Sequence, residues 1–296
     1  MSPDNEGVKF TFGWEHLDKK DIPEVDAIIH LAGKAHDTKN RGKADEYFAV
    51  NTELTKKIYD YFLASKARKF IFFSSVKAAA DTLKDRILDE DVIPAPVGPY
   101  GESKLAAEEA ILQKEDAFQR QMVKNGEQSD KKTYILRSCM IHGPGNKGNL
   151  NLLYGMVKKG IPWPLGAFEN KRSFTSIDNV SFVVSTLLCS EVEEGLYNLN
   201  DDEAFSTNEL IEIICEAMGR KAHIWRIPCW IMEGVAMIGG WLHLPLDSER
   251  FKKLTESYVS SSAKLKKAIG IEQLPVRAKD GFLKTIHSFE LSNRKQ

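Results

Sequence analysis

Short apolar runs alternate with longer amphipathic segments along the N-terminal half of the chain. Runs of consecutive apolar residues are typical of strands buried on both faces of a sheet, and apolar positions three or four residues apart are typical of helices. The strand pattern occurs at 25–31, 69–74 and 134–141, and the helix pattern at 44–64 and 103–112. This repeated alternation predicts βαβ units, a parallel sheet and helices on both of its faces.

The C-terminal half has a looser pattern. Residues 113–132 are polar and contain Asn125-Gly126, which predicts a helix end followed by a surface loop. Helical patterns follow at 150–159, 179–189 and 207–218, with short apolar segments between them. We therefore expect an α/β fold with a Rossmann-like, doubly wound parallel sheet and a smaller C-terminal α/β lobe.

Composition excludes several classes of protein. The 296 residues include 41 Lys and Arg against 42 Asp and Glu, which leaves a formal net charge of -1. This balance does not suit a protein that neutralises nucleic-acid phosphates, so no nucleic-acid partner is expected. The 42% hydrophobic content does not suit a disordered chain. The four cysteines lack the spacing of a metal site and indicate a reducing compartment, the cytoplasm.

The sequence predicts neither a secretory signal nor a membrane span. The first residues lack a basic segment followed by an apolar one. The best candidate span, 227–246, is interrupted by Glu233, Gly239-Gly240 and His243, whereas a spanning helix needs about 20 largely uncharged apolar residues. We interpret this stretch first as lobe core or lid, and second as a dimer or membrane-facing surface, which leaves a homodimer open.

Polar residues that can carry chemistry follow the predicted strands, at the sheet edge where α/β folds bind ligands. Ser75 follows the strand at 69–74, and Tyr100 and Lys104 are four residues apart on one face of a helix. An unperturbed phenol has a pKa of about 10, and a nearby Lys104 cation is expected to lower the pKa of Tyr100. Tyr100 can then exchange a proton with a substrate oxygen that Ser75 holds in place. The alternative interpretation is that Tyr100 and Lys104 have this spacing by chance and no catalytic role, because the spacing is common on amphipathic helices.

Six motifs occur in an order that spans most of the chain: VDAIIHLAGKAHD, the Asn51 of VNTELT, KFIFFSSVKAAA, PYGESK, LRSCMIHGPGN and NKRSFTSIDNV. Together they resemble the NAD-dependent epimerase/dehydratase family of the extended short-chain dehydrogenase/reductase superfamily, which acts on nucleotide sugars. The resemblance implies an NAD(P)-binding Rossmann-like domain at 1–145 and about 173–200. It also implies a substrate-binding lobe at 146–172 and 201–296.

The resemblance also implies roles for the matching residues. Ser75, Tyr100 and Lys104 match the family's catalytic Ser/Thr, Tyr and Lys. The residues implied to bind NAD, with NADP as the alternative, are Leu31, Ala32, Gly33, Asn51, Ser74, Tyr100 and Lys104. The residues implied to bind the substrate, a UDP-linked sugar, are Ser75, Asn149 at the nucleotide and Arg172 at the diphosphate.

The sequence departs from the family at several positions. The family begins with a glycine-rich strand–turn–helix unit that holds the cofactor's pyrophosphate. Residues 8–12 resemble the third strand of the fold, so the first βαβ unit, of about 30 residues, is expected to be absent from this chain. Smaller departures are Ser138, His142 and Ala79, where relatives more often carry Pro, Tyr and Tyr, and these bear on substrate fit.

Residues 143–148 form a literal GxGxxG between a strand and a helix, but we do not assign them to the cofactor. Pro144 lacks an N–H group, and the position of the motif after Lys104 places it on the substrate side. His30 and His36 lack partners at metal-ligand spacing, so no metal site is expected.

Three reactions of the family share the Ser–Tyr–Lys trio. A dehydratase places an acidic pair directly after the catalytic Ser/Thr, where this chain has Val76 and Lys77, so that reaction is disfavoured. We expect a UDP-sugar 4-epimerase-like enzyme, with an NAD(P)H-dependent 4-keto reductase of a UDP-6-deoxyhexosamine as the alternative. A hypothesis of another class is a truncated, non-catalytic remnant that binds a nucleotide sugar without turning it over.

Overall fold

The structure is a computed structural model that describes residues 9–19, 22–35, 43–81, 87–146, 149–232, 234, 251 and 254–294. Four parallel strands form the central sheet in the order β1-β2-β3-β6, and β4 and β5 form a second parallel pair. The strands are β1 (Ala27–His30), β2 (Lys69–Ser75), β3 (Lys132–Ser138), β4 (Met140–His142), β5 (Phe174–Ser176) and β6 (Gly195–Leu199). The parallel sheet confirms the predicted α/β fold.

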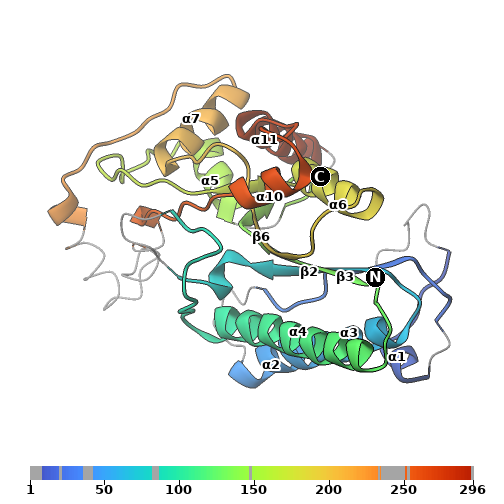
Figure 1. Ribbon diagram of the computed structural model, residues 1–296. Helices are drawn as coiled ribbons and strands as arrows, with labels where there is room; N and C mark the ends of the chain where they lie inside the picture. Colours follow the sequence, from blue (N-terminus) through green and yellow to red (C-terminus); the bar gives the residue numbers. More distant parts are fainter. Residues whose placement is uncertain are drawn as a thin grey trace.

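Helices cover both faces of the central sheet (Figure 1). In this view α3 and α4 lie below the sheet and α6 lies above it. The helices are α1 (His16–Lys19), α2 (Ala44–Phe48), α3 (Leu54–Ala64), α4 (Pro99–Lys124), α5 (Asn149–Lys158), α6 (Ile177–Cys189), α7 (Thr207–Ala217), α10 (Ala263–Ile269) and α11 (Ala278–Arg294). A π-helical turn, η1 (Ala49–Glu53), precedes α3, and a 3₁₀ turn, η2 (Val76–Ala78), follows β2.

Strand β2 shows why helices are needed on both faces. Phe70 and Phe72 belong to the apolar cluster with α3 and α4, whereas Ile71 and Phe73 belong to the cluster with α6. All four side chains are buried. Successive side chains of a strand point to opposite faces, so an uninterrupted apolar run requires cover on both sides.

A separate apolar core lies among α5, α7 and α11. It contains Tyr154 of α5, Ile214 of α7 and Phe282 of α11, together with Trp163 from the segment after α5. Phe174 of β5 also belongs to this core. This core lies where the sequence predicts a second lobe, and the exact lobe boundaries stay a prediction.

Serine side chains mark the starts of α6 and α7. The Oγ of Ser176 accepts a hydrogen bond from the N–H of Asn179 at 3.2 Å. Before α7, Ser206 and Glu209 form a capping box, in which each side chain accepts from the backbone N–H of the other. These bonds satisfy N–H groups that have no partner within the helix, so the local sequence sets both helix starts.

One predicted helix end is confirmed, and one predicted strand is divided in two. Helix α4 continues to Lys124 and ends at the predicted Asn125-Gly126 turn, where Gly126 has a φ of 73°. The run at 134–141 divides into β3 and β4 at Cys139, whose N–H donates to the carbonyl of Leu199 at 3.0 Å. Strand pairing thus passes from the central sheet to β5, a change that periodicity does not encode.

The expected strand at 8–12 is wrong for its described part. Residues 9–12 lie outside any strand, and Phe10 is 65% exposed. A strand is maintained by a hydrogen-bonded neighbour, and no described strand pairs with this segment. Within the described residues, no helix is long and apolar enough to cross a membrane, and most of 227–246 lies outside them.

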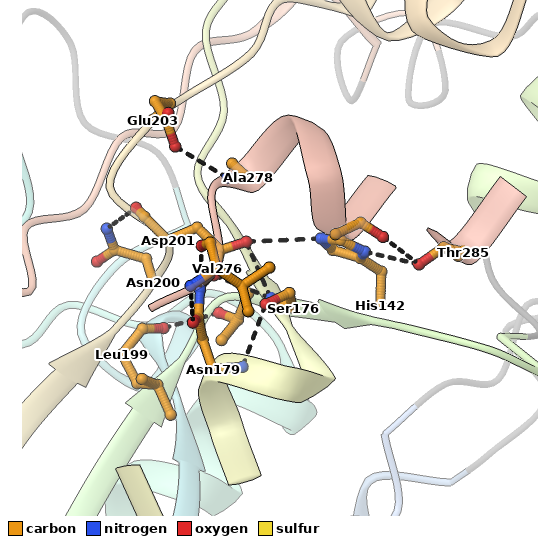
Figure 2. A network of polar contacts seen from close by, with 12 residues as sticks. His142, Ser176, Asn179, Leu199, Asn200, Asp201, Glu203, Val276, Ala278 and Thr285 are labelled. Carbon is orange, nitrogen blue, oxygen red and sulfur yellow. Dashed lines mark hydrogen bonds and ion pairs between the residues drawn. The ribbon is translucent and has the colours of Figure 1, made fainter. Parts of the chain in front are cut away.

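A buried polar network joins the sheets to α11 (Figure 2). The carboxylate of Asp201, just after β6, accepts from the backbone N–H of Ser176 at 3.0 and 2.9 Å and from Nδ2 of Asn179 at 2.7 Å. His142, at the end of β4, lies between Asp201 and Thr285, with Nε2 3.6 Å from Oδ2 of Asp201. Its Nδ1 is 3.1 Å from Oγ1 of Thr285 on α11. The network therefore connects β4, β5, α6 and α11.

This location explains the departure at His142. The His142 side chain is buried, and its ring stacks on Phe282 at a centroid distance of 4.0 Å. The histidine therefore contributes to the packing of β4 against α11, and an effect of His142 on substrate fit stays a prediction.

Candidate active site

Ser75 and Tyr100 meet at the carboxyl end of β2. Ser75 is the last residue of the strand, and its Oγ accepts a hydrogen bond from the N–H of Lys77 at 3.2 Å. Tyr100 lies in the first turn of α4, and its side chain hydrogen-bonds to that of Ser75. The two predicted catalytic residues are therefore adjacent, at the sheet edge expected for ligand binding.

The start of α4 places Tyr100 at this edge. Gly98 precedes the helix with a φ of 83°, and Pro99 occupies the first helical position, where its missing N–H group has no cost. A Cβ on Gly101 would lie 2.5 Å from the carbonyl oxygen of Lys77. Glycine at 101 thus allows the helix to approach the turn that follows Ser75.

Lys104 lies one helical turn beyond Tyr100 and is buried. Its Nζ donates to the carbonyl of Phe73 at 2.7 Å and lies 4.7 Å from the ring centroid of Phe72. Burial lowers the pKa of Lys104 to about 8, and the negative charge of Glu108 opposes this shift. Lys104 therefore remains mostly protonated at neutral pH.

The prediction that Lys104 lowers the pKa of Tyr100 is wrong. The pKa of Tyr100 is raised, because burial disfavours the phenolate and because Tyr47 lies nearby. The hydrogen bond from Ser75 acts in the opposite direction and lowers the pKa. In this structure the Lys104 ammonium is bonded to the Phe73 carbonyl, and Ser75 is the group that favours the phenolate.

Asn51 fixes the loop that follows β1. Its Oδ1 accepts from the N–H of Lys34 at 2.7 Å, and its Nδ2 donates to the carbonyl of Lys34 at 3.1 Å and to Oγ of Ser103 at 2.9 Å. Asn51 lies in the π-helical turn η1, a kind of irregularity that is frequent at functional sites. A Cβ on Gly33 would lie 3.1 Å from Nζ of Lys104 and 3.3 Å from Oδ1 of Asn51. The loop therefore passes directly over Lys104.

The remaining predicted cofactor residues have different surroundings. Leu31 is 67% exposed, and Ala32 is partly buried. Ser74 is buried and donates its hydroxyl hydrogen bond to Oε1 of Glu108 on α4. Contact of Leu31, Ala32 or Ser74 with a cofactor stays a prediction.

Glu108 and Arg137, which were not predicted from the sequence, form a buried ion pair behind Ser74. Nη2 of Arg137 is 2.7 Å from Oε2 of Glu108, and Nε is 3.1 and 3.2 Å from the two carboxylate oxygens. Both side chains are less than 5% exposed. An arginine within the apolar run YILRSC was the available signal, because such a charge requires a buried partner.

Besides Ser75, the predicted substrate residues are Arg172 and Asn149, in the second half of the chain. The backbone of Arg172 bridges Phe205 and Tyr258, and its Nε donates to the carbonyl of Glu256 at 3.2 Å. Burial lowers the pKa of Arg172, against the charges of Glu256 and Asp81. Asn149 is the first residue of α5. Substrate contacts of Arg172 and Asn149 stay predictions.

His30 is a buried neutral histidine at the end of β1. Its Nε2 lies 2.7 Å from Oγ1 of Thr55, whose hydroxyl donates to the carbonyl of Asn51. His30 therefore donates to Thr55. Burial, followed by the charge of Lys104, lowers the pKa of His30 to about 4. Among the described residues, no group of three His, Cys, Asp or Glu side chains is placed to hold a metal ion.

We expect His30 to make the free energy of unfolding depend on pH in the acidic range. The unfolded imidazole binds a proton below a pKa of about 6.5 and the folded one only below about 4, so the free energy of unfolding decreases as pH falls between these values. This gap between the two pKa values corresponds to a loss of roughly 3 kcal/mol in the free energy of unfolding. Urea unfolding across this pH range should show a weaker dependence in His30→Gln. The exposed-site control His287→Gln should behave like the parent, and an unchanged dependence in His30→Gln would contradict the assignment.

The glycines of the 143–148 motif have packing and turn roles in the described part. A Cβ on Gly143 would lie 2.5 Å from Cγ2 of Ile177, and Gly145 has a φ of 80°. Residues 147 and 148 lie outside the described residues. The close contact of Gly143 with α6 accounts for that glycine without a bound phosphate.

Comparison with protein families matches residues 16–210 to the model described as the 3-beta hydroxysteroid dehydrogenase/isomerase family. A UDP-glucose 4-epimerase of Vibrio cholerae is 27% identical over 279 residues, which cover 93% of this chain and 80% of the relative. An N-acetyl-alpha-D-glucosaminyl-diphospho-ditrans,octacis-undecaprenol 4-epimerase of Escherichia coli O157:H7 is 25% identical. The aligned residues cover 82% of this chain and 67% of the length of that relative. A GDP-6-deoxy-D-mannose reductase of Pseudomonas aeruginosa is 25% identical. The aligned residues cover 66% of this chain and 64% of the length of that relative.

Solved structures share the fold. The UDP-glucuronic acid 4-epimerase of Bacillus cereus in complex with NAD matches with a TM-score of 0.66 and 18% identity, over 93% of this chain and 77% of that protein. RMD from Pseudomonas aeruginosa complexed with NADPH matches with a TM-score of 0.68 and 20% identity, over 97% of this chain and 89% of that protein.

Proposed function

Since the chain belongs to the 3-beta hydroxysteroid dehydrogenase/isomerase family, whose relatives here include NAD-dependent sugar epimerases, we propose that it is a 4-epimerase of a UDP-linked sugar in the cytoplasm. The family uses NAD or NADP, and its members are oxidoreductases and isomerases. The observation that supports the proposal is the hydrogen bond between Ser75 and Tyr100 at the carboxyl end of β2, one helical turn from a protonated Lys104.

The described residues at this edge fit part of a nicotinamide dinucleotide. The loop at Gly33 lies close to Lys104 and Asn51, because a Cβ there would be only 3.1 Å from Nζ of Lys104 and 3.3 Å from Oδ1 of Asn51. Glycine at such a position lets a ligand approach the backbone closely. Gly33, Tyr100 and Lys104 would hold the cofactor at the ends of β1 and β2. When bound, the nicotinamide accepts a hydride from a sugar carbon and returns it.

In the proposed reaction, Tyr100 acts as general base and then as general acid at the C4 oxygen of the sugar. Tyr100 would accept the proton of the C4 hydroxyl when that carbon is oxidised, and would return it when the carbon is reduced from the opposite face. Ser75 orients the same oxygen and favours the phenolate through its hydrogen bond to Tyr100. Lys104, held by the carbonyl of Phe73, supplies a fixed positive charge beneath the site.

Arg172 is proposed to bind the diphosphate of the substrate. Replacing Arg172 with alanine should raise the dissociation constant for UDP by about tenfold to a hundredfold, because a hydrogen bond to a charged group is lost. Isothermal titration with UDP measures this directly. The matched control is Arg120→Ala on the exposed surface of α4, where no change is expected. Equal affinity in the Arg172 and Arg120 variants would refute this assignment.

The alternative reaction is the reduction of a 4-keto sugar with NADPH. The similarity to the GDP-6-deoxy-D-mannose reductase supports this alternative. The two reactions differ in their use of cofactor: a reductase oxidises one NADPH for each product formed, whereas an epimerase leaves the amount of NAD unchanged.

The deciding experiment incubates the purified chain and NAD with UDP-glucose, and separately with UDP-N-acetylglucosamine, and follows the sugars by proton NMR. Appearance of the 4-epimer without net NADH supports the epimerase. Stoichiometric loss of NADPH with a UDP-6-deoxy-4-keto-hexosamine would favour the reductase instead. Tight UDP binding without turnover of any of these sugars would support the non-catalytic hypothesis.

A further inference from the structure

Two tryptophans are exposed on the segment 219–232, which leaves α7 and runs along the upper left of the molecule (Figure 1). Trp225 is 57% exposed and Trp230 is 73% exposed. The backbone at Trp225 is well anchored: its N–H donates to the carbonyl of Trp163 at 2.8 Å, and the N–H of Gly166 donates to its carbonyl at 3.0 Å. The Trp225 side chain is therefore exposed although the backbone at this residue is held in place by two hydrogen bonds.

Inward and outward side chains alternate along this segment. Ala222 and Ile224 are partly buried against the core of α5, α7 and α11, whereas Lys221, His223 and Trp225 are exposed. An extended chain directs successive side chains to opposite sides. The outer side of the segment therefore carries a lysine, a histidine and a tryptophan at alternate positions.

The charge of this surface is positive. Residues 219–232 include Arg220, Lys221 and Arg226 and contain no Asp or Glu. Nη1 of Arg220 donates to the carbonyl of Lys158 at 2.9 Å, which brings the end of α5, with exposed Lys158 and Lys159, to the same side. The segment that carries the exposed tryptophans is therefore rich in basic residues.

We propose that this surface, defined by Trp225, Trp230, Lys221 and Arg226, binds the headgroup region of an anionic lipid bilayer. Tryptophan combines an apolar ring with one N–H donor and is favoured at the boundary between water and lipid. Lysine and arginine are attracted to the negative potential of anionic lipids. Interfacial binding requires both kinds of side chain on one face, and the alternation places Lys221 and Trp225 together on the outer side, with Arg226 and Trp230 exposed in the same segment.

Charge also favours a bilayer over a second copy of the chain. A two-fold dimer through this face would place the same patch of both copies together. Two positively charged patches would then face each other, and juxtaposed like charges oppose association. An anionic bilayer instead complements them.

The test is co-sedimentation with vesicles of phosphatidylcholine alone and vesicles of equal parts phosphatidylglycerol and phosphatidylcholine. We expect binding to the anionic vesicles that weakens as NaCl is raised. The double variant Trp225→Ala/Trp230→Ala should bind about tenfold more weakly, because the aromatic anchors are lost. Lys221→Ala/Arg226→Ala should bind about 25-fold more weakly, since each basic residue contributes about fivefold near an anionic surface. The control Trp14→Ala, which removes a tryptophan that is 58% exposed elsewhere, should bind like the parent.

Three results would overturn the proposal. They are no binding to the anionic vesicles, equal binding to both kinds of vesicle, and unchanged binding in both double variants. Light scattering completes the test. A dimer that dissociates in Trp225→Ala/Trp230→Ala would identify the surface as a contact between copies of the chain. Circular dichroism of each variant verifies its fold, and the charge variant tests the proposal independently of the tryptophans.

Discussion

Tyr100→Phe is expected to lower the turnover rate by a factor of about 10² to 10⁴, the usual contribution of a positioned general acid–base group. The substitution removes only the phenolic oxygen, so the aromatic ring remains beside Tyr47 and the start of α4 keeps its packing. Substrate affinity should change by no more than about tenfold, because a lost neutral hydrogen bond contributes about 0.5–1.5 kcal/mol.

The measurement separates binding from chemistry. Titration calorimetry with UDP gives the affinity, and single-turnover kinetics with the substrate identified by NMR give the rate. Tyr197→Phe on β6 is the control, since its phenolic oxygen donates to the carbonyl of Glu193, before the start of that strand. A Tyr100→Phe enzyme with the full parental rate would refute the proposed mechanism. Equal losses of rate in both variants would show that the effect is not specific to this site.

The second large effect concerns stability. Glu108→Ala is expected to lower the free energy of unfolding by about 3–5 kcal/mol, because it leaves the guanidinium of Arg137 buried without its counter-charge. It also removes the acceptor of the Ser74 hydroxyl. Equilibrium unfolding in urea measures the loss. Glu109→Ala, at the next and exposed position of α4, should change stability by less than about 0.5 kcal/mol.

A double variant distinguishes the loss of the pair from the loss of packing. Glu108→Leu with Arg137→Met removes both charges and keeps apolar volume, so much of the stability should return. If Glu108→Ala unfolds at the same urea concentration as Glu109→Ala, the ion pair does not contribute as the structure implies. Because Ser74 lies next to Ser75, the pair also supports the strand end that carries the candidate site.

Much of the central fold was predictable from periodicity. The apolar run at Lys69–Ser75 requires cover on both faces, and this requirement alone predicts helices above and below β2. The four-residue spacing of Tyr100 and Lys104 predicts that they share a helix face. The order of motifs adds Ser75, and the structure brings its side chain to that of Tyr100.

Long-range contacts decided what periodicity could not. The Glu108–Arg137 pair and the network around His142 join residues that are distant in the sequence, and no local pattern records such a partner. The pKa of Tyr100 is another case: the sequence places a cation four residues away, but the direction of the shift depends on how far burial removes the phenol from water.

The sequence by itself therefore determined the parallel sheet, the helices on its two faces and the candidate catalytic trio, since these follow from side-chain period and from residue type at strand and helix ends. Only the tertiary structure decided which carbonyl holds Lys104, which buried charges are paired and which tryptophans face solvent. The physical reason is that burial, hydrogen-bond partners and local charge are properties of atoms brought together by folding, and each depends on residues far apart along the chain.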